Sequence, residues 1–173
     1  STMAAVAHQA DSWTAPTAIS PIVGGRSDAF APSPEPRFLV VAGGGAPSYN
    51  EIALEKNVRY FLRTLAQMER SVAAASIFFA NGNDGQATIR YLDPRGIERF
   101  KAPDISGLTG AATQANVQAW LNTYPETAEG TENCPVFMYF TGHGALNTAN
   151  DDNNAMILWE ETLMSVRDLA TTL

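Results

Sequence analysis

The chain has 173 residues, of which 45% are apolar and only 17% are charged. This is enough apolar material for one buried core and too little length for two comfortable domains. Eighteen acidic residues against eleven Lys and Arg give a net charge of -7, so no net field favours nucleic acid or an anionic membrane as a partner. Without a run of about 18 apolar residues, we expect no transmembrane helix, no intact signal peptide and a soluble chain.

Residues 1–36 differ in composition from the rest of the chain. They contain five prolines and eight alanines without helical or alternating periodicity, and they end in Pro-Ser-Pro-Glu-Pro. This composition favours extended backbone. We therefore interpret residues 1–36 as a Pro/Ala-rich tail that contributes no catalytic group, His8 included, and residues 37–173 as one domain.

The domain is predicted to begin with a buried strand and an amphipathic helix. Residues 37–42 form an apolar run of strand length that Gly43-Gly44-Gly45 closes, a pattern typical of a parallel sheet buried on both faces. The Ser-x-x-Glu spacing of Ser48 and Glu51 predicts a capping box, and apolar residues three and four apart then predict a helix to about Arg70.

The later elements continue the alternation of strands and helices. In chain order they are a buried strand at 76–80, a short peripheral strand at 88–92, a helix capped by Thr113, a third buried strand at 135–141, a hairpin that pairs 156–159 with 162–164, and a helix from Ser165. The alternation predicts an α/β fold, a three-layer open sheet that is mostly parallel. Such sheets carry their functional groups in the crevice beyond the carboxyl ends of the strands, here loops 43–48 and 142–146.

His143 is the one side chain in these two loops that exchanges protons near neutral pH. Gly142 and Gly144 flank it, and glycines allow a sharp turn and a close approach to a substrate. The backbone N–H of Gly144 could also point at a developing oxyanion. The position at a strand end favours a catalytic histidine over a polar loop residue.

Residues 139–144, Tyr-Phe-Thr-Gly-His-Gly, resemble the histidine motif of the caspase-haemoglobinase fold cysteine peptidases, closest to the legumain-like members. The order of elements over residues 37–173 is similar as well. The resemblance implies a caspase-like fold and cleavage of peptide or protein substrates. It also implies that His143 is the general acid and base and that Gly144 contributes to the oxyanion hole. We expect neither a cofactor nor a metal ion.

The nucleophile of that family is a cysteine after the next strand of the sheet, and the sequence stops before such a strand. The single cysteine, Cys134, lies nine residues before His143 on the same predicted strand. At about 3.3 Å per residue the two side chains should be more than ~20 Å apart. We therefore expect Cys134 to be structural and the nucleophile to be absent from this polypeptide. The cellular compartment is undetermined.

Three explanations for the missing nucleophile stay open. The chain is the larger fragment of a proteolytically processed thiol protease whose C-terminal fragment brings the cysteine, a truncated polypeptide, or a degenerate scaffold. We favour the first, because the strand at 135–141 would otherwise leave an apolar sheet edge uncovered. The third corresponds to an inactive caspase-fold interaction module.

A nucleotide-binding α/β domain is the rival from another class. Gly43-Gly44-Gly45 precedes a helix N-terminus where a phosphate could bind. The Gly-x-Gly-x-x-Gly pattern nevertheless fails at Ser48, and no Gly-Lys-Ser or Gly-Lys-Thr occurs.

Asp151 and Asp152 could coordinate calcium, but their spacing matches no EF-hand, so a solvated loop is the favoured interpretation.

Overall fold

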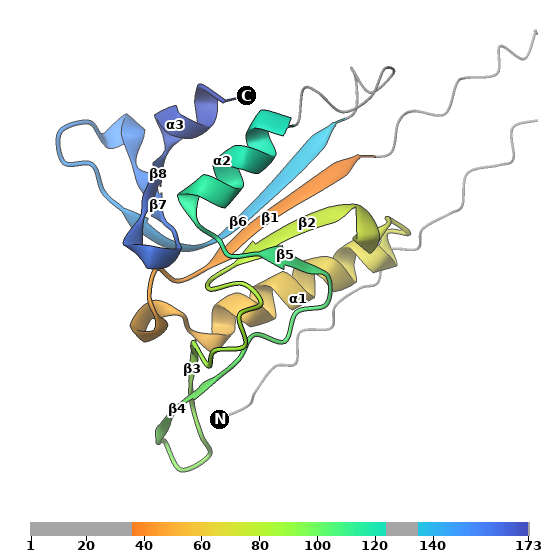
Figure 1. Ribbon diagram of the computed structural model, residues 1–173, viewed down its shortest axis with the longest axis vertical. Coiled ribbons are helices and arrows are strands. Elements are labelled where there is room, and N and C mark those ends of the chain that lie inside the picture. The colour runs from red at the N-terminus through yellow and green to blue at the C-terminus, as the bar shows by residue number, and fades with distance from the viewer. Residues whose placement is uncertain (1–35, 124–134, 173) are drawn as a thin grey trace, which may run out of the picture. The chain divides into compact units, whose positions relative to one another are not determined.

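A computed structural model of the protein describes residues 36–123 and 135–172. Its centre is a six-stranded, mostly parallel sheet in the order β5-β2-β1-β6-β7-β8 (Figure 1). The strands are β1 (Arg37–Gly43), β2 (Ala75–Phe79), β5 (Leu108–Gly110), β6 (Val136–Ala145), β7 (Ala155–Ile157) and β8 (Leu163–Ser165). A separate antiparallel hairpin is made of β3 (Ile89–Leu92) and β4 (Glu98–Lys101).

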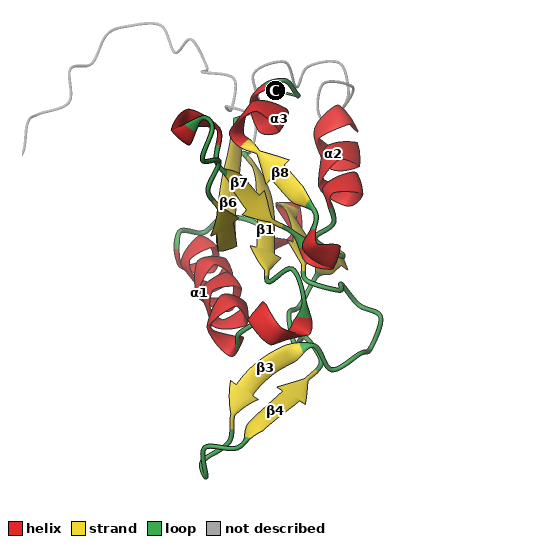
Figure 2. Ribbon diagram, turned by 90° about the vertical axis from the view of Figure 1, so that its left-hand side faces the viewer, coloured by secondary structure: helices red, strands yellow, loops and turns green. Residues whose placement is uncertain are grey.

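Helices lie on both faces of the sheet, so the α/β prediction of three layers is confirmed (Figure 2). They are α1 (Ile52–Gln67), α2 (Gln114–Thr123) and α3 (Val166–Ala170), with short 3-10 turns at Pro47–Tyr49, Val72–Ala74, Asp151–Asn153 and Trp159–Glu161. None of the helices in the described part of the chain has the length and apolar character needed to cross a bilayer.

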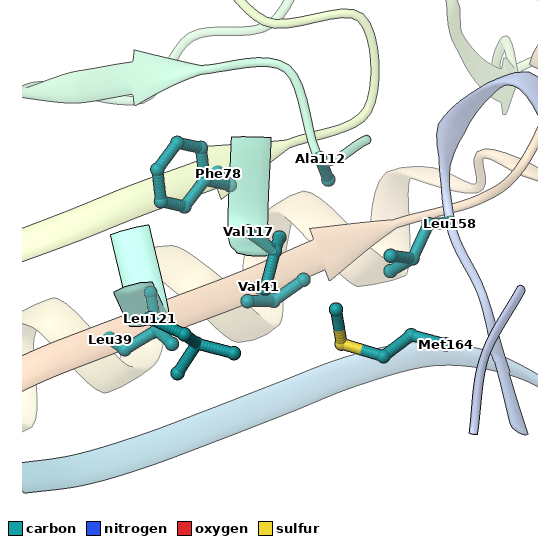
Figure 3. Close-up of a cluster of buried hydrophobic side chains, with 8 residues drawn as sticks. All are labelled: Leu39, Val41, Phe78, Ala112, Val117, Leu121, Leu158 and Met164. Atoms are coloured by element: carbon teal, nitrogen blue, oxygen red, sulfur yellow. The ribbon is translucent and has the colours of Figure 1, made fainter. Parts of the chain in front are cut away.

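The two faces of β1 belong to two different cores, because successive side chains of a strand point to opposite sides. Val40 and Ala42 pack against α1, where Val58 is fully buried. Leu39 and Val41 pack on the other face with α2 and with the β7–β8 hairpin, as Figure 3 shows for Val117, Leu121, Leu158 and Met164. This burial on both sides explains why the sequence of β1 is apolar without alternation.

Most predicted elements are confirmed with shifts of a few residues at their ends. The predicted hairpin is present as the antiparallel pair β7 and β8, and Thr113 accepts a hydrogen bond from the Asn116 N–H at 3.2 Å in the first turn of α2. Strands β4 and β5 are not predicted from the sequence, because they are short and do not carry a buried apolar run. The predicted tail and Cys134 lie outside the described residues, Pro36 excepted.

The predicted capping box of α1 is wrong. Ser48 lies in the 3-10 turn Pro47–Tyr49, and the N-cap of α1 is Glu51, whose side chain makes no capping hydrogen bond. The physical reason is Asn50, which is fully buried and accepts a hydrogen bond from the Gly44 N–H at 3.1 Å. With Asn50 anchored, the Glu51 carboxylate is directed to partners outside its own helix.

The predicted strand end before His143 is also wrong. β6 continues through Gly142, His143 and Gly144 to Ala145, because β7 pairs with His143–Ala145. Neither Gly142 nor Gly144 has a positive φ, so they make no sharp turn. Gly142 instead allows β6 to lie close to the end of β1, since a Cβ on it would lie 2.8 Å from the carbonyl oxygen of Gly43.

Candidate functional site

The site lies at the carboxyl edge of the sheet, where β1 ends and the neighbouring β6 continues beyond it. In the parallel register Gly43 is opposite Gly142, so His143 is the first residue of β6 beyond the end of β1. Its side chain is 44% exposed. His143 therefore lies at the carboxyl edge of the sheet, on a strand rather than in the predicted loop.

One imidazole nitrogen of His143 is held by two oxygen atoms. Nε2 lies 2.9 Å from Glu51 Oε2 and 3.0 Å from the carbonyl oxygen of Tyr49. The Tyr49 ring also meets the imidazole edge to face, with 6.3 Å between ring centroids. Within residues 36–123 and 135–172, Nδ1 has no hydrogen-bond partner.

Glu51 connects His143 to the β3–β4 hairpin. Its Oε1 accepts a hydrogen bond from Arg90 Nη2 at 3.0 Å, and Arg90 Nη1 lies 3.3 Å from Glu98 Oε2. Burial raises the pKa of the Glu51 carboxyl, but hydrogen bonds from His143, its own backbone and Arg90 outweigh burial and lower that pKa below its ordinary value of 4.5. Glu51 is therefore a carboxylate at neutral pH.

A buried group of amide and hydroxyl side chains fixes the backbone that carries Tyr49 and Glu51. Asn50 accepts from Gly44 and donates to the Thr88 carbonyl oxygen at 3.4 Å, and the Thr88 hydroxyl donates to Asn81 Oδ1 at 2.5 Å. Asn50, Thr88 and Asn81 are all buried. Since buried polar groups cost free energy unless they are paired, this network defines one conformation of the loop after β1.

Gly144, the predicted oxyanion-hole residue, lies on β6 opposite Met156. A Cβ built there would come no closer than 3.6 Å to another atom outside its neighbours, the carbonyl oxygen of Ala155. The position is thus open on the face where a side chain would stand. The described residues supply no thiol, because Cys134 is outside them.

The contacts of the loop after β1 do not favour a bound phosphate. The Gly44 N–H is already paired with Asn50, and the N-terminus of α1 carries the Glu51 carboxylate, which repels an anion.

In the loop at residues 147–154, the side-chain oxygens of Asn147, Asn150 and Asn154 accept hydrogen bonds from backbone N–H groups of the same loop. Those oxygens serve loop geometry, and the described residues contain no cluster able to hold a metal.

Sequence reasoning missed Glu51 and Arg90 as members of the site. The Ser48–Glu51 spacing predicts a capping box, yet the place of Glu51 directly after the loop of β1 puts it at the same sheet edge as His143. That topological argument could have identified it. Arg90 carried no such signal, because only the docking of the β3–β4 hairpin brings it to Glu51, 39 residues away.

No protein-family model matches the chain, and no match is found among curated proteins or among solved structures. The contacts of the site therefore carry the functional interpretation.

Proposed function

We propose that residues 37–173 are the histidine-bearing portion of a cysteine endopeptidase with a caspase-like fold, similar to the legumain-like members. In this proposal the nucleophilic cysteine belongs to a polypeptide portion outside the 173 residues, the C-terminal fragment of the same precursor. The substrate is a peptide or protein. No cofactor, nucleic acid or membrane takes part.

The proposed reaction follows acyl transfer to a thiol. His143 removes the proton of the cysteine thiol, and the thiolate attacks the scissile carbonyl carbon. The Gly144 N–H donates to the oxyanion of the tetrahedral intermediate. His143 then returns the proton to the departing amine as the C–N bond breaks, and water hydrolyses the resulting thioester with His143 as base.

The observation that carries the proposal is the orientation of His143. Nε2 is within hydrogen-bond distance of one carboxylate oxygen of Glu51 and of the Tyr49 carbonyl oxygen. Nδ1 has no hydrogen-bond partner in the described part of the chain. An imidazole held at one nitrogen and open at the other is suited to transfer protons to a reactant. Its place at the carboxyl edge of a parallel sheet adds support.

The open edge of β6 supports a second polypeptide portion as partner. Among the described strands, Val136–Gly142 pairs only with β1, so its other edge has no ladder partner. Apolar side chains border this edge: Phe137 is 56% exposed, and a cavity of about 350 Å³ lies beside Phe140, Met156 and Met164. A further strand parallel to β6 would pair this backbone and bring its carboxyl end toward His143.

Reconstitution of hydrolysis tests the proposal. The purified 173-residue chain should hydrolyse no peptide, because a histidine base without a thiolate has no covalent route. Adding the C-terminal portion should restore hydrolysis, and the variant Cys134→Ser should behave as the parent chain does. Peptide hydrolysis by the 173-residue chain alone, retained in Cys134→Ser, would contradict the proposal.

The inactive interaction module is the second candidate, and the same open edge of β6 favours it. It predicts that the C-terminal portion binds without any hydrolysis, and that His143→Ala leaves binding unchanged. Titration calorimetry beside the hydrolysis assay separates the two candidates.

A further inference from the structure

We infer that Glu51, held in place by Arg90, is a positioning residue that keeps the proton of neutral His143 on Nε2 and leaves Nδ1 as the nitrogen that exchanges protons. The tautomer follows from contacts in this chain. The exchange with a thiol rests on the proposed function.

The tautomer follows from the atoms that face Nε2. A carbonyl oxygen and a carboxylate oxygen can only accept hydrogen bonds, and they lie 3.0 and 2.9 Å from Nε2. If Nε2 carried its lone pair, that lone pair would face two oxygen atoms of like partial charge. In a neutral imidazole the proton is therefore on Nε2, and the lone pair is on Nδ1.

The two acceptors differ in strength. A hydrogen bond to an ionised carboxylate is roughly twice as strong as one to a neutral carbonyl oxygen. Glu51 therefore contributes more than Tyr49 to the preference for the Nε2–H tautomer. Tyr49 contributes through a backbone atom that no substitution removes, so the contribution of Glu51 can be isolated by mutation.

Arg90 holds the Glu51 carboxylate from the opposite side. The Arg90 N–H donates to the Asn50 carbonyl oxygen at 2.8 Å, which ties β3 to the residue before Glu51, and Nη2 donates to Glu51 Oε1 at 3.0 Å. Each oxygen of Glu51 thus has a different partner. Free rotation of the glutamate would lose both contacts, so Arg90 limits the positions from which Glu51 can reach His143.

Nitrogen-15 NMR of the full 173-residue chain, at a pH where imidazoles are neutral, tests the inference. The chain has two histidines, and His8→Gln assigns the remaining signals to His143. We expect the shifts of a single Nε2–H tautomer. Glu51→Ala should raise the Nδ1–H fraction about tenfold, the equivalent of about 1.4 kcal/mol. Glu51→Gln and Arg90→Gln should raise it less.

Glu98→Gln is the matched control, because Glu98 contacts Arg90 and not His143. It should leave the tautomer as in the parent chain, and amide spectra establish that each variant is folded. An Nδ1–H tautomer in the parent chain would overturn the inference. So would an unchanged Nε2–H tautomer in both Glu51→Ala and Glu51→Gln, since one of these two retains the shape of the side chain.

The result is independent of peptidase activity. If the Glu51 substitutions change the tautomer of His143 but the C-terminal portion restores no hydrolysis, the proposed function is rejected and the positioning role of Glu51 is kept. If hydrolysis is restored but the Glu51 substitutions leave the tautomer unchanged, the proposed function is kept and the positioning role is rejected.

Discussion

The two chain segments at the carboxyl edge of the sheet are built in opposite ways. The loop after β1 is held by one of its own residues, because Asn50 is buried and forms hydrogen bonds with both Gly44 and Thr88. The end of β6 is held by residues from other parts of the chain, because it pairs with β7 and because exposed His143 contacts Tyr49 and Glu51 of that loop. The first segment is fixed by buried side chains, and the second presents the His143 side chain at the surface. The following substitutions test this difference.

The largest effect is expected for His143→Ala, tested in the polypeptide that includes the cysteine portion. Peptide hydrolysis should fall roughly 10⁴-fold or more, since removing one member of a nucleophile-base pair costs nearly as much as removing both. Stability should change little, because the His143 side chain is close to half exposed. Steady-state kinetics and thermal unfolding measure the two quantities. Near-normal kcat in a folded His143→Ala protein would remove His143 from the mechanism.

The glycines of the two segments should respond differently to alanine. In Gly44→Ala the new Cβ would lie 2.1 Å from the Tyr49 carbonyl oxygen, so the backbone of the rigid loop must shift. We expect a loss of about 3 kcal/mol in unfolding free energy. In Gly144→Ala the nearest atom is 3.6 Å away, and we expect a change below about 1 kcal/mol. Urea denaturation checks both, and equal losses would refute the difference between the segments.

Asn50→Ala should destabilise the protein by about 2 kcal/mol, because it leaves the buried Gly44 N–H without a partner. The control is Asn57→Ala, which removes a 3.0 Å hydrogen bond to Thr141 in an exposed position and should cost about 0.5 kcal/mol. Chemical denaturation measures the unfolding free energy of both variants. If Asn57→Ala lowers it as much as Asn50→Ala does, the buried hydrogen bonds of Asn50 do not stabilise the loop after β1 more than an exposed hydrogen bond would.

The smallest effect is a pH dependence that Glu51 introduces. Its pKa is lowered in the folded protein, so its contribution to stability is present above the unfolded value near 4.5 and is lost as the pH falls through the folded pKa. The stability difference between the parent chain and Glu51→Gln should therefore shrink on acidification below about pH 4.5. A difference that grows on acidification would mean that the pKa of Glu51 is raised.

The sequence predicts the buried strands and α1 better than it predicts the contacts of the candidate site. The buried strands and α1 follow from apolar runs and three- and four-residue spacing, and these patterns depend on local residues alone. Where the chain makes long-range contacts, local patterns fail: the Ser48–Glu51 spacing predicts a capping box, but Asn50 and Arg90 direct Glu51 to His143. His143 was found because a glycine-flanked histidine follows an apolar run. Its partners depend on how three separate elements dock.

The most direct test of the proposed function is covalent labelling of the precursor that contains both portions. A peptide-based electrophile should modify one cysteine outside residues 1–173, located by mass spectrometry of the digested protein. Labelling should disappear in His143→Ala and persist in Cys134→Ser. Modification of Cys134, or labelling of the distant cysteine that is unchanged in folded His143→Ala, would contradict the assignment of His143 as the base that activates a thiol supplied from outside this chain.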